Sequence, residues 1–97
     1  MDNTTIFLLT VFNYNKGRYR LVGIFLNKDE AEHCVVHNCV DIADDGYYTH
    51  AVIEEIKEGV YPTCLNRVFF SFNRESNCFE LCDCPNIKLD DLVLIAF

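Results

Sequence analysis

The spacing of apolar residues at the start of the chain predicts two strands joined by a tight turn. Residues 5–14 are almost continuously apolar and rich in β-branched and aromatic side chains, which is typical of a central strand. Residues 18–26 have the same character, and Gly23 within them indicates a bulge or a close backbone approach. The Asn-Lys-Gly sequence at residues 15–17 favours a turn, because glycine adopts positive φ at little cost. We therefore expect a β-hairpin here.

The apolar spacing then changes to that of a helix. Asn27 is a favourable N-cap residue, and Glu30 lies at the capping-box position. One stripe of side chains follows at helical spacing and predicts a single helix over residues 28–42. The stripe consists of Ala31, Cys34, Val35, Asn38, Cys39 and Ile42. Because Asn38 lies on this stripe, we expect its amide to be buried and to bond backbone groups where the helix ends.

Three further strands are expected in the second half of the chain. An Asp-Asp-Gly turn at residues 44–46 precedes a strand over residues 47–58. Residues 67–73 and 77–82 flank a short polar stretch and read as a second hairpin. The apolar run at residues 89–97 fits an extra C-terminal strand or a short helix, and we favour the strand.

The predicted fold is α+β in a single domain of residues 1–97, since a chain of 97 residues supports one domain. It has an antiparallel sheet with elements in the order ββα-β-ββ and one helix packed on one face. Hydrophobic residues make up 51% of the chain, which is far from the composition of disordered proteins.

The charge and hydropathy of the chain argue against nucleic acid and membrane as partners. The formal net charge is −7, which disfavours direct binding of nucleic acid or of an anionic membrane, since both need clustered Lys and Arg. The chain contains no run of 18 apolar residues, so we expect no transmembrane helix. The start of the chain, Met-Asp-Asn-Thr-Thr, lacks the basic region of a secretory signal. We therefore expect a cytoplasmic protein with neither nucleic acid nor membrane as its partner.

The six cysteines raise the question of disulfides and metal. Reduced thiols are the expectation for a cytoplasmic chain. Two clusters contain soft ligands: His33 and His37 share a helix face, and Cys78, Cys82 and Cys84 follow one another near the second hairpin. Neither cluster has the Cys-x₂-Cys pairing of ordinary structural zinc sites, so we expect no cofactor. A small metal- or ligand-binding domain that uses these clusters stays open as an alternative.

No catalytic motif is present. The chain contains no nucleophile elbow, no phosphate-binding loop and no His-Glu-x-x-His sequence. Glu54 and Glu55 are adjacent in a predicted strand, so their side chains face opposite sides and do not form a paired-carboxylate site. The sequence therefore predicts a protein that is not an enzyme.

Acidic and aromatic residues instead indicate a surface that binds another protein. Aromatic side chains within a charged rim are typical of interface hot spots. A negative patch would steer the chain towards a host protein with a basic surface. The expected contact residues are Asp44, Asp45, Tyr47, Tyr48, Glu55, Glu58 and Tyr61. Solubility alone would also account for the carboxylates.

A longer pattern of residues carries a resemblance. It consists of Gly23-x-Phe25, Glu30-Ala31, Val35, Asn38, Asp41-Ile42, Tyr47-Tyr48, Ala51-Val52-Ile53-Glu54 and Gly59-x-Tyr61-Pro62. It resembles a family of small acidic proteins, largely uncharacterised, that bacteria, bacteriophages and mobile elements encode. The resemblance covers residues 21–85 and implies a fold and a genomic setting. It implies no activity.

These observations lead to one hypothesis of function and two alternatives. The hypothesis is a non-enzymatic inhibitor or adaptor, encoded by a phage or mobile element, that binds a host defence protein or a nucleic-acid-handling protein through its acidic and aromatic surface. The first alternative is the metal- or ligand-binding domain. The second is a homo-oligomeric structural module, of which a homodimer is the simplest form.

Overall fold

The computed structural model describes residues 5–13, 15–44, 46–57 and 63–83, and for residues 63–65 it describes the backbone only. The expectations for Asp45, Glu58, Tyr61, Cys84 and the strand over residues 89–97 lie outside these ranges.

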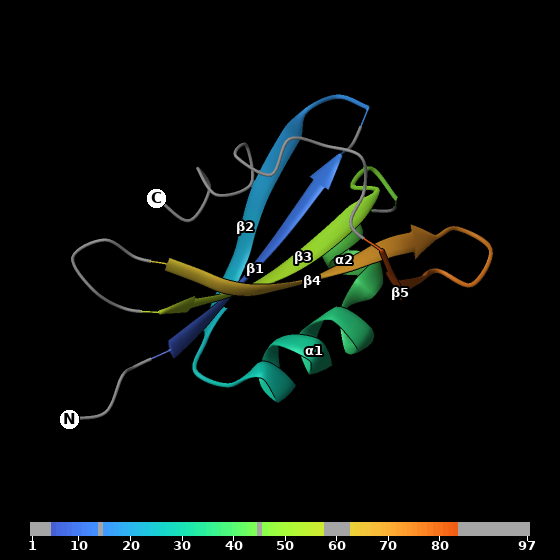
Figure 1. Ribbon diagram of the computed structural model, residues 1–97. Coiled ribbons are helices and arrows are strands. Elements are labelled where there is room, and N and C mark those ends of the chain that lie inside the picture. The colour runs from blue at the N-terminus through green and yellow to red at the C-terminus, as the bar shows by residue number, and fades with distance from the viewer. Residues whose placement is uncertain (1–4, 14, 45, 58–62, 84–97) are drawn as a thin grey trace.

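Five strands form one antiparallel sheet in the spatial order β2-β1-β3-β4-β5 (Figure 1). Hydrogen-bonded neighbours run antiparallel throughout. The strands are β1 (Thr5–Asn13), β2 (Arg18–Phe25), β3 (His50–Lys57), β4 (Thr63–Asn73) and β5 (Cys78–Cys82). The structure is thus a small α+β domain with an antiparallel sheet, as the alternation of strand and helix patterns predicts.

The prediction of a single helix over residues 28–42 is wrong, because two helices occupy this stretch. Helix α1 spans Lys28–His37 and α2 spans Cys39–Ala43. Asn38 separates them with φ −120° and ψ 24°, outside the helical region. Its side chain is exposed, and its Nδ2 lies 3.7 Å from the Cys34 Sγ. The expectation of a buried Asn38 amide is therefore also wrong. Asparagine forms local side-chain bonds that compete with the helical backbone, which suits it to a break.

The predicted N-cap at Asn27 is confirmed, and the Glu30 side chain reaches back to the Asn27 side chain instead of to its backbone N–H as in a capping box. The backbone N–H of Glu30 donates to Asn27 Oδ1 at 2.8 Å, and Asn27 Nδ2 donates to Glu30 Oε1 at 3.3 Å. Gly23 is also confirmed at a bulge: the register between β1 and β2 shifts after Leu9, which pairs with Gly23. A Cβ at Gly23 would lie 3.2 Å from the Phe25 ring.

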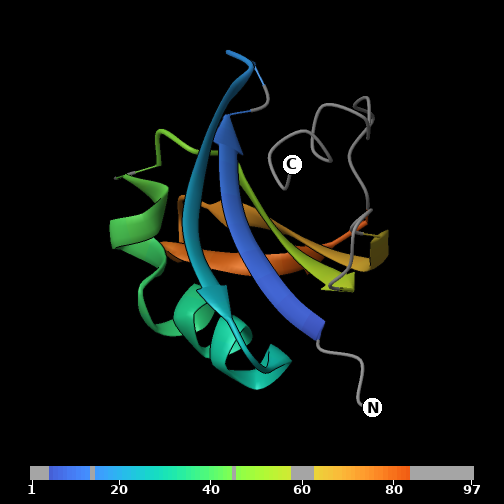
Figure 2. The same cartoon turned by 90° about the vertical axis from the view of Figure 1, so that its left-hand side faces the viewer.

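Both helices lie on the same face of the sheet, which we call the helix face (Figure 2). Apolar side chains of all layers meet there in the main core. Its strand and helix members are Leu9, Val11, Ala31, Val35, Cys39, Ile42, Ala43, Ala51, Ile53, Phe70 and Phe79. Burial of these side chains is the main stabilising contribution, at about 25 cal/mol for each Å² of apolar surface removed from water.

The opposite face of β1, β3 and β4, which we call the second face, is buried as well. Phe12, Val52 and Phe69 form a separate apolar cluster there. Two polar side chains, Thr10 and Glu54, are completely buried beside it. Burial on both faces explains why β1 is almost continuously apolar instead of alternating.

Candidate functional site

The chain leaves α2 through a tight turn at residues 44–48, which we call the 44–48 turn. Asp44 takes left-handed φ (52°), and its N–H donates to the carbonyls of Asp41 and Val40. The N–H of Tyr47 donates to the Asp44 carbonyl at 3.1 Å, and the N–H of Tyr48 donates to the Ala43 carbonyl at 2.9 Å. The turn is thus folded back against the end of α2.

Side chains from the sheet and from the β4–β5 connection hold this region in place. Asn13 Nδ2, at the end of β1, donates to the Tyr47 carbonyl at 2.6 Å. Arg74 Nη2, beyond β4, donates to the Gly46 carbonyl at 3.1 Å. These two contacts satisfy backbone carbonyls of the turn, so its conformation is fixed by residues distant in sequence.

A third contact comes from β2. Arg20 Nη2 donates to the Ile42 carbonyl at 3.1 Å, and the Arg20 guanidinium lies 5.1 Å from the centroid of the Tyr48 ring. A cation over an aromatic face is attracted by the ring quadrupole. Arg20 therefore links the end of α2 to the turn.

The two tyrosines of the turn have different environments. Tyr48 is half-buried and packs against the main core. Tyr47 is 38% exposed, and its ring meets that of Tyr48 edge to face, with centroids 4.9 Å apart. Tyr48 thus supports Tyr47, which presents its ring to solvent beside the exposed Asp44. The structure brings these three predicted contact residues together.

The charge around the turn is mixed. Asp41 is exposed in the first turn of α2, and Asp44 is exposed at its C-terminal end. A negative side chain at Asp44 adds no stability, because that end of a helix is itself negative. Arg20 offsets this charge from β2. Arg74 adds a second cation on the other side of the turn. The sequence did not reveal these arginines as part of the site, because they lie 22 and 28 residues from their acceptors.

Glu55 lies apart from the turn. It is half-buried on β3 and pairs in register with Phe7 of β1 and with Asn66 of β4. Five residues of strand separate it from His50, which corresponds to about 17 Å. The structure therefore does not bring Glu55 together with the 44–48 turn.

Glu54 was not predicted to be a buried group. Its Oε2 lies 3.1 Å from Arg67 Nε, and its side chain is fully buried. Among the residues that the structure describes, the other oxygen, Oε1, has no hydrogen-bond partner, and neither has Thr10 Oγ1. Burial raises the pKa of Glu54, while the hydrogen bond and the charge of Arg67 act in the opposite direction.

The histidine and cysteine clusters do not assemble a metal site within the described residues. The rings of His33 and His37 lie with centroids 3.9 Å apart on the exposed side of α1. In the part of the chain that the structure describes, no group of three or more His, Cys, Asp and Glu side chains is placed to hold a metal ion. Cys78 and Cys82 lie on β5, and Cys84 is outside the described ranges.

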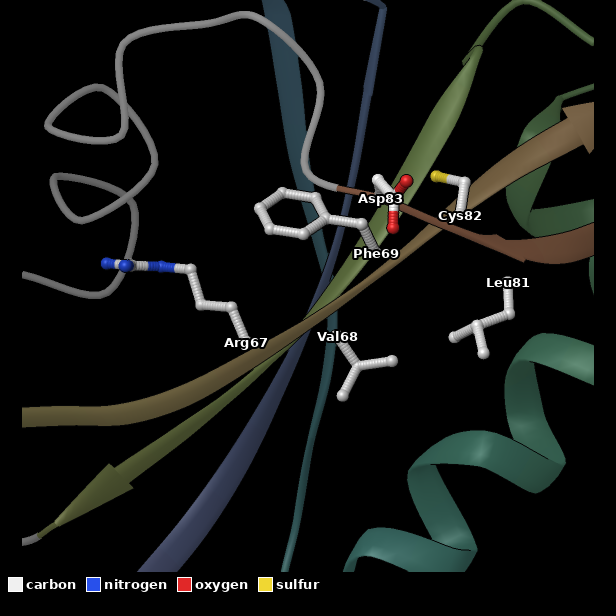
Figure 3. A pocket seen from close by; sticks show the side chains of 6 residues that line it. All are labelled: Arg67, Val68, Phe69, Leu81, Cys82 and Asp83. Carbon is white, nitrogen blue, oxygen red and sulfur yellow. The ribbon is translucent and has the colours of Figure 1, made fainter.

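A cavity of about 510 Å³ lies where β5 ends beside β4 (Figure 3). It is lined by Arg67, Val68, Phe69, Leu81, Cys82 and Asp83. Phe69 and Cys82 lie on the opposite side of these strands from Val68 and Leu81, which are on the side of α1 (Figure 3). Its cationic group, Arg67, also pairs with Glu54.

No helix of the described residues has both the length and the apolar character to cross a bilayer. Comparisons of the chain with protein-family models, with curated proteins and with solved structures returned no match.

Proposed function

We propose that the protein is a non-enzymatic inhibitor or adaptor that binds a host protein through the 44–48 turn. The observation that carries this proposal is the exposed Tyr47 ring, which packs edge to face on Tyr48 and follows the exposed Asp41 and Asp44 in the chain. A rigid aromatic side chain within a charged rim is the usual composition of an interface hot spot.

Preorganisation of the turn supports the same function. Asn13, Arg20 and Arg74 fix the backbone around Tyr47 before any partner arrives. Association costs free energy whenever loops and side chains must be ordered, so a turn that is already ordered binds more tightly for the same contacts.

Charge favours a host protein with a basic surface as the partner. The chain carries a net charge of −7, and Asp41 and Asp44, which precede Tyr47 in the chain, are exposed. Complementary charge raises the association rate and suppresses wrong partners. Direct nucleic-acid binding is disfavoured by the same net charge.

The proposed setting is the cytoplasm of a bacterial host, with a phage or mobile element as the source of the protein. The resemblance of residues 21–85 to small acidic proteins of bacteria, bacteriophages and mobile elements supports this setting. A host defence protein or a nucleic-acid-handling protein fits as the target, because proteins that bind nucleic acid carry basic surfaces that an acidic protein can occupy.

The test is affinity capture from bacterial lysate with the wild-type protein, with Tyr47→Ala and with Tyr19→Ala. Tyr19 is a matched control, because it is 37% exposed against 38% for Tyr47 but belongs to β2. Tyr47→Ala is expected to lose a protein that wild type and Tyr19→Ala retain. Equal capture by all three chains would contradict the proposal. Capture of further copies of this chain alone would identify the homo-oligomeric module instead.

A further inference from the structure

The described sheet has an edge strand at each margin. β2 and β5 are the first and last strands in the spatial order, and each is hydrogen-bonded to a single neighbouring strand among the described residues (Figure 1). An edge strand carries backbone N–H and C=O groups that can pair with a strand of another molecule. Both strands also present exposed apolar side chains, which are Leu21 and Ile24 on β2 and Leu81 on β5.

The two edges carry opposite charge. Arg18 is exposed on β2, and residues 3–28 contain no Asp or Glu although the chain has 15 of them. Glu80 is exposed on β5, and residues 75–87 contain no Lys or Arg. Its hydrogen-bond donor is the neutral Asn73 amide, at 3.2 Å, which does not offset its charge. Because unlike charges attract across paired strands and like charges repel, the charge of β2 complements that of β5 in another copy.

The directions of the strands determine how two copies can meet. Neighbouring strands are antiparallel throughout the sheet, so β2 and β5 of one copy run in the same direction. Antiparallel pairing, which is slightly more stable per residue than parallel pairing, therefore requires the second copy to be turned over. The helix face of its β2 then lies on the same side as the second face of β5 in the first copy.

The turned-over arrangement brings the unlike charges together. Arg20 pairs in register with Val11 of the main core, so Arg20 and Arg18 project from the helix face of β2. Glu80 projects from the second face of β5, as does Cys82, which packs against the apolar cluster of that face. The carboxylate of one copy and the guanidinium groups of the other therefore lie on one side of the paired strands.

The same arrangement brings the apolar side chains together on the other side. Leu81 pairs in register with Phe70 of the main core and lies on the helix face of β5 (Figure 3). Leu21 pairs with Thr10 and lies on the second face of β2. Leu81 is 73% exposed and Leu21 is 45% exposed, so each leaves apolar surface to bury. Parallel pairing without turning would instead place Leu81 beside the arginines.

We propose that a second copy of this chain is the partner of both edges, with β5 of one copy pairing antiparallel with Arg18–Leu21 of the next. The bulge after Leu21 leaves these residues as a regular stretch, which suits the five residues of β5. The contact joins different surfaces of the two copies, so each added copy leaves one free edge at either end and the assembly stays open. This self-association does not depend on the proposed host partner.

The test is sedimentation velocity of the full chain across a wide range of protein concentration. The average mass of wild type is expected to increase with concentration and to decrease when salt screens the opposite charges. Arg18→Glu and Glu80→Arg each place like charges across the contact and should keep the protein monomeric where wild type assembles. Both changes in one chain restore complementary charge and should recover assembly. Lys57→Glu is the control, since it makes the same charge change as Arg18→Glu at an exposed position of the central strand β3.

The apolar side of the contact has its own matched variants. Leu81→Ser should reduce assembly, whereas Leu26→Ser should not, because Leu26 is equally exposed (75% against 73%) but lies outside both paired stretches. Wild type that is monomeric at every concentration would overturn the proposal. Assembly that Arg18→Glu abolishes and Glu80→Arg does not would also overturn it, since a symmetric contact between two β2 strands would then be responsible. Assembly that Leu81→Ser leaves unchanged would do the same.

Discussion

Arg67 pairs with Glu54 across strands β3 and β4, with Arg67 Nε 3.1 Å from Glu54 Oε2. The two residues are directly opposed in the strand register. The glutamate side chain is fully buried, whereas the arginine side chain is 18% exposed. The carboxylate therefore depends on one charged neighbour, and desolvation of a buried ion pair offsets much of its attraction.

We predict that replacing both members of this pair with methionine preserves or raises stability. The double variant Glu54→Met, Arg67→Met removes the desolvation cost and is expected to change the free energy of unfolding by between zero and about +4 kcal/mol. Arg67→Met alone leaves the Glu54 carboxylate unpaired and should lower the free energy of unfolding by about 3–5 kcal/mol. Urea denaturation of the three proteins measures both values. A double variant as unstable as the single one would show that the pair is net stabilising.

The raised pKa of Glu54 predicts that stability falls as pH rises. Because burial raises this pKa, the folded protein holds the carboxyl proton at pH values where the unfolded chain has lost it. The unfolded state then binds fewer protons, so the free energy of unfolding decreases from the ordinary carboxyl range, about pH 4.3, up through the raised pKa. Glu54→Gln cannot titrate and should flatten this decrease in urea denaturation at a series of pH values. An equal slope in wild type and variant would contradict the assignment.

His50 produces the opposite dependence of stability on pH, in a window that begins at about pH 6.5 and extends downward. Its ring stacks on Phe12 with centroids 5.2 Å apart, and burial lowers its pKa. The unfolded chain therefore binds a proton first, and stability is lost as pH falls from about 6.5 through the lowered pKa. His50→Gln should reduce the loss of stability in this window. The measurement is thermal unfolding at constant ionic strength, and an unchanged slope would show that another group is responsible.

Asn27 and Asn38 form a matched pair for testing helix capping. The Asn27 side chain accepts the Glu30 N–H, whereas Asn38 makes no side-chain cap bond at the start of α2. Asn27→Ala is expected to lower the free energy of unfolding by about 1 kcal/mol. Asn38→Ala should change it by no more than about 0.5 kcal/mol, as is usual for an exposed position. Equal losses in chemical denaturation would contradict the difference in role.

Elements with local determinants were predictable from the sequence. The first hairpin, the N-cap at Asn27 and the bulge at Gly23 each depend on residues close to one another in the chain. The break at Asn38 was not predictable, because Cys39 and Ile42 stay in phase with the apolar stripe and are both buried. A one-residue interruption that preserves the buried face leaves no trace in the periodicity.

The burial of Glu54 and the side chains that hold the 44–48 turn could not be predicted from the sequence, for a different reason. A glutamate in a strand looks like a solvent-facing position, but both faces of β3 are buried and the Glu54 side chain is buried with them. Arg20 and Arg74 reach the turn from β2 and from beyond β4, which no local pattern encodes. Asp44 and Tyr47 could be proposed from sequence because they belong to the turn itself.

The 44–48 turn predicts distinct kinetic effects for its charged and aromatic residues. Asp41→Lys with Asp44→Lys reverses exposed charges, so it should slow association with the captured host protein most strongly at low salt. Tyr47→Ala removes the ring that is proposed to contact the partner and should instead raise the dissociation rate. Neither change should unfold the protein, since the three side chains are exposed and the turn is held through its backbone. Binding kinetics at two salt concentrations measure both effects, with Tyr19→Ala as the control. If the charge-reversed protein associates as fast as wild type at low salt, the carboxylates serve solubility alone and recognition does not depend on charge.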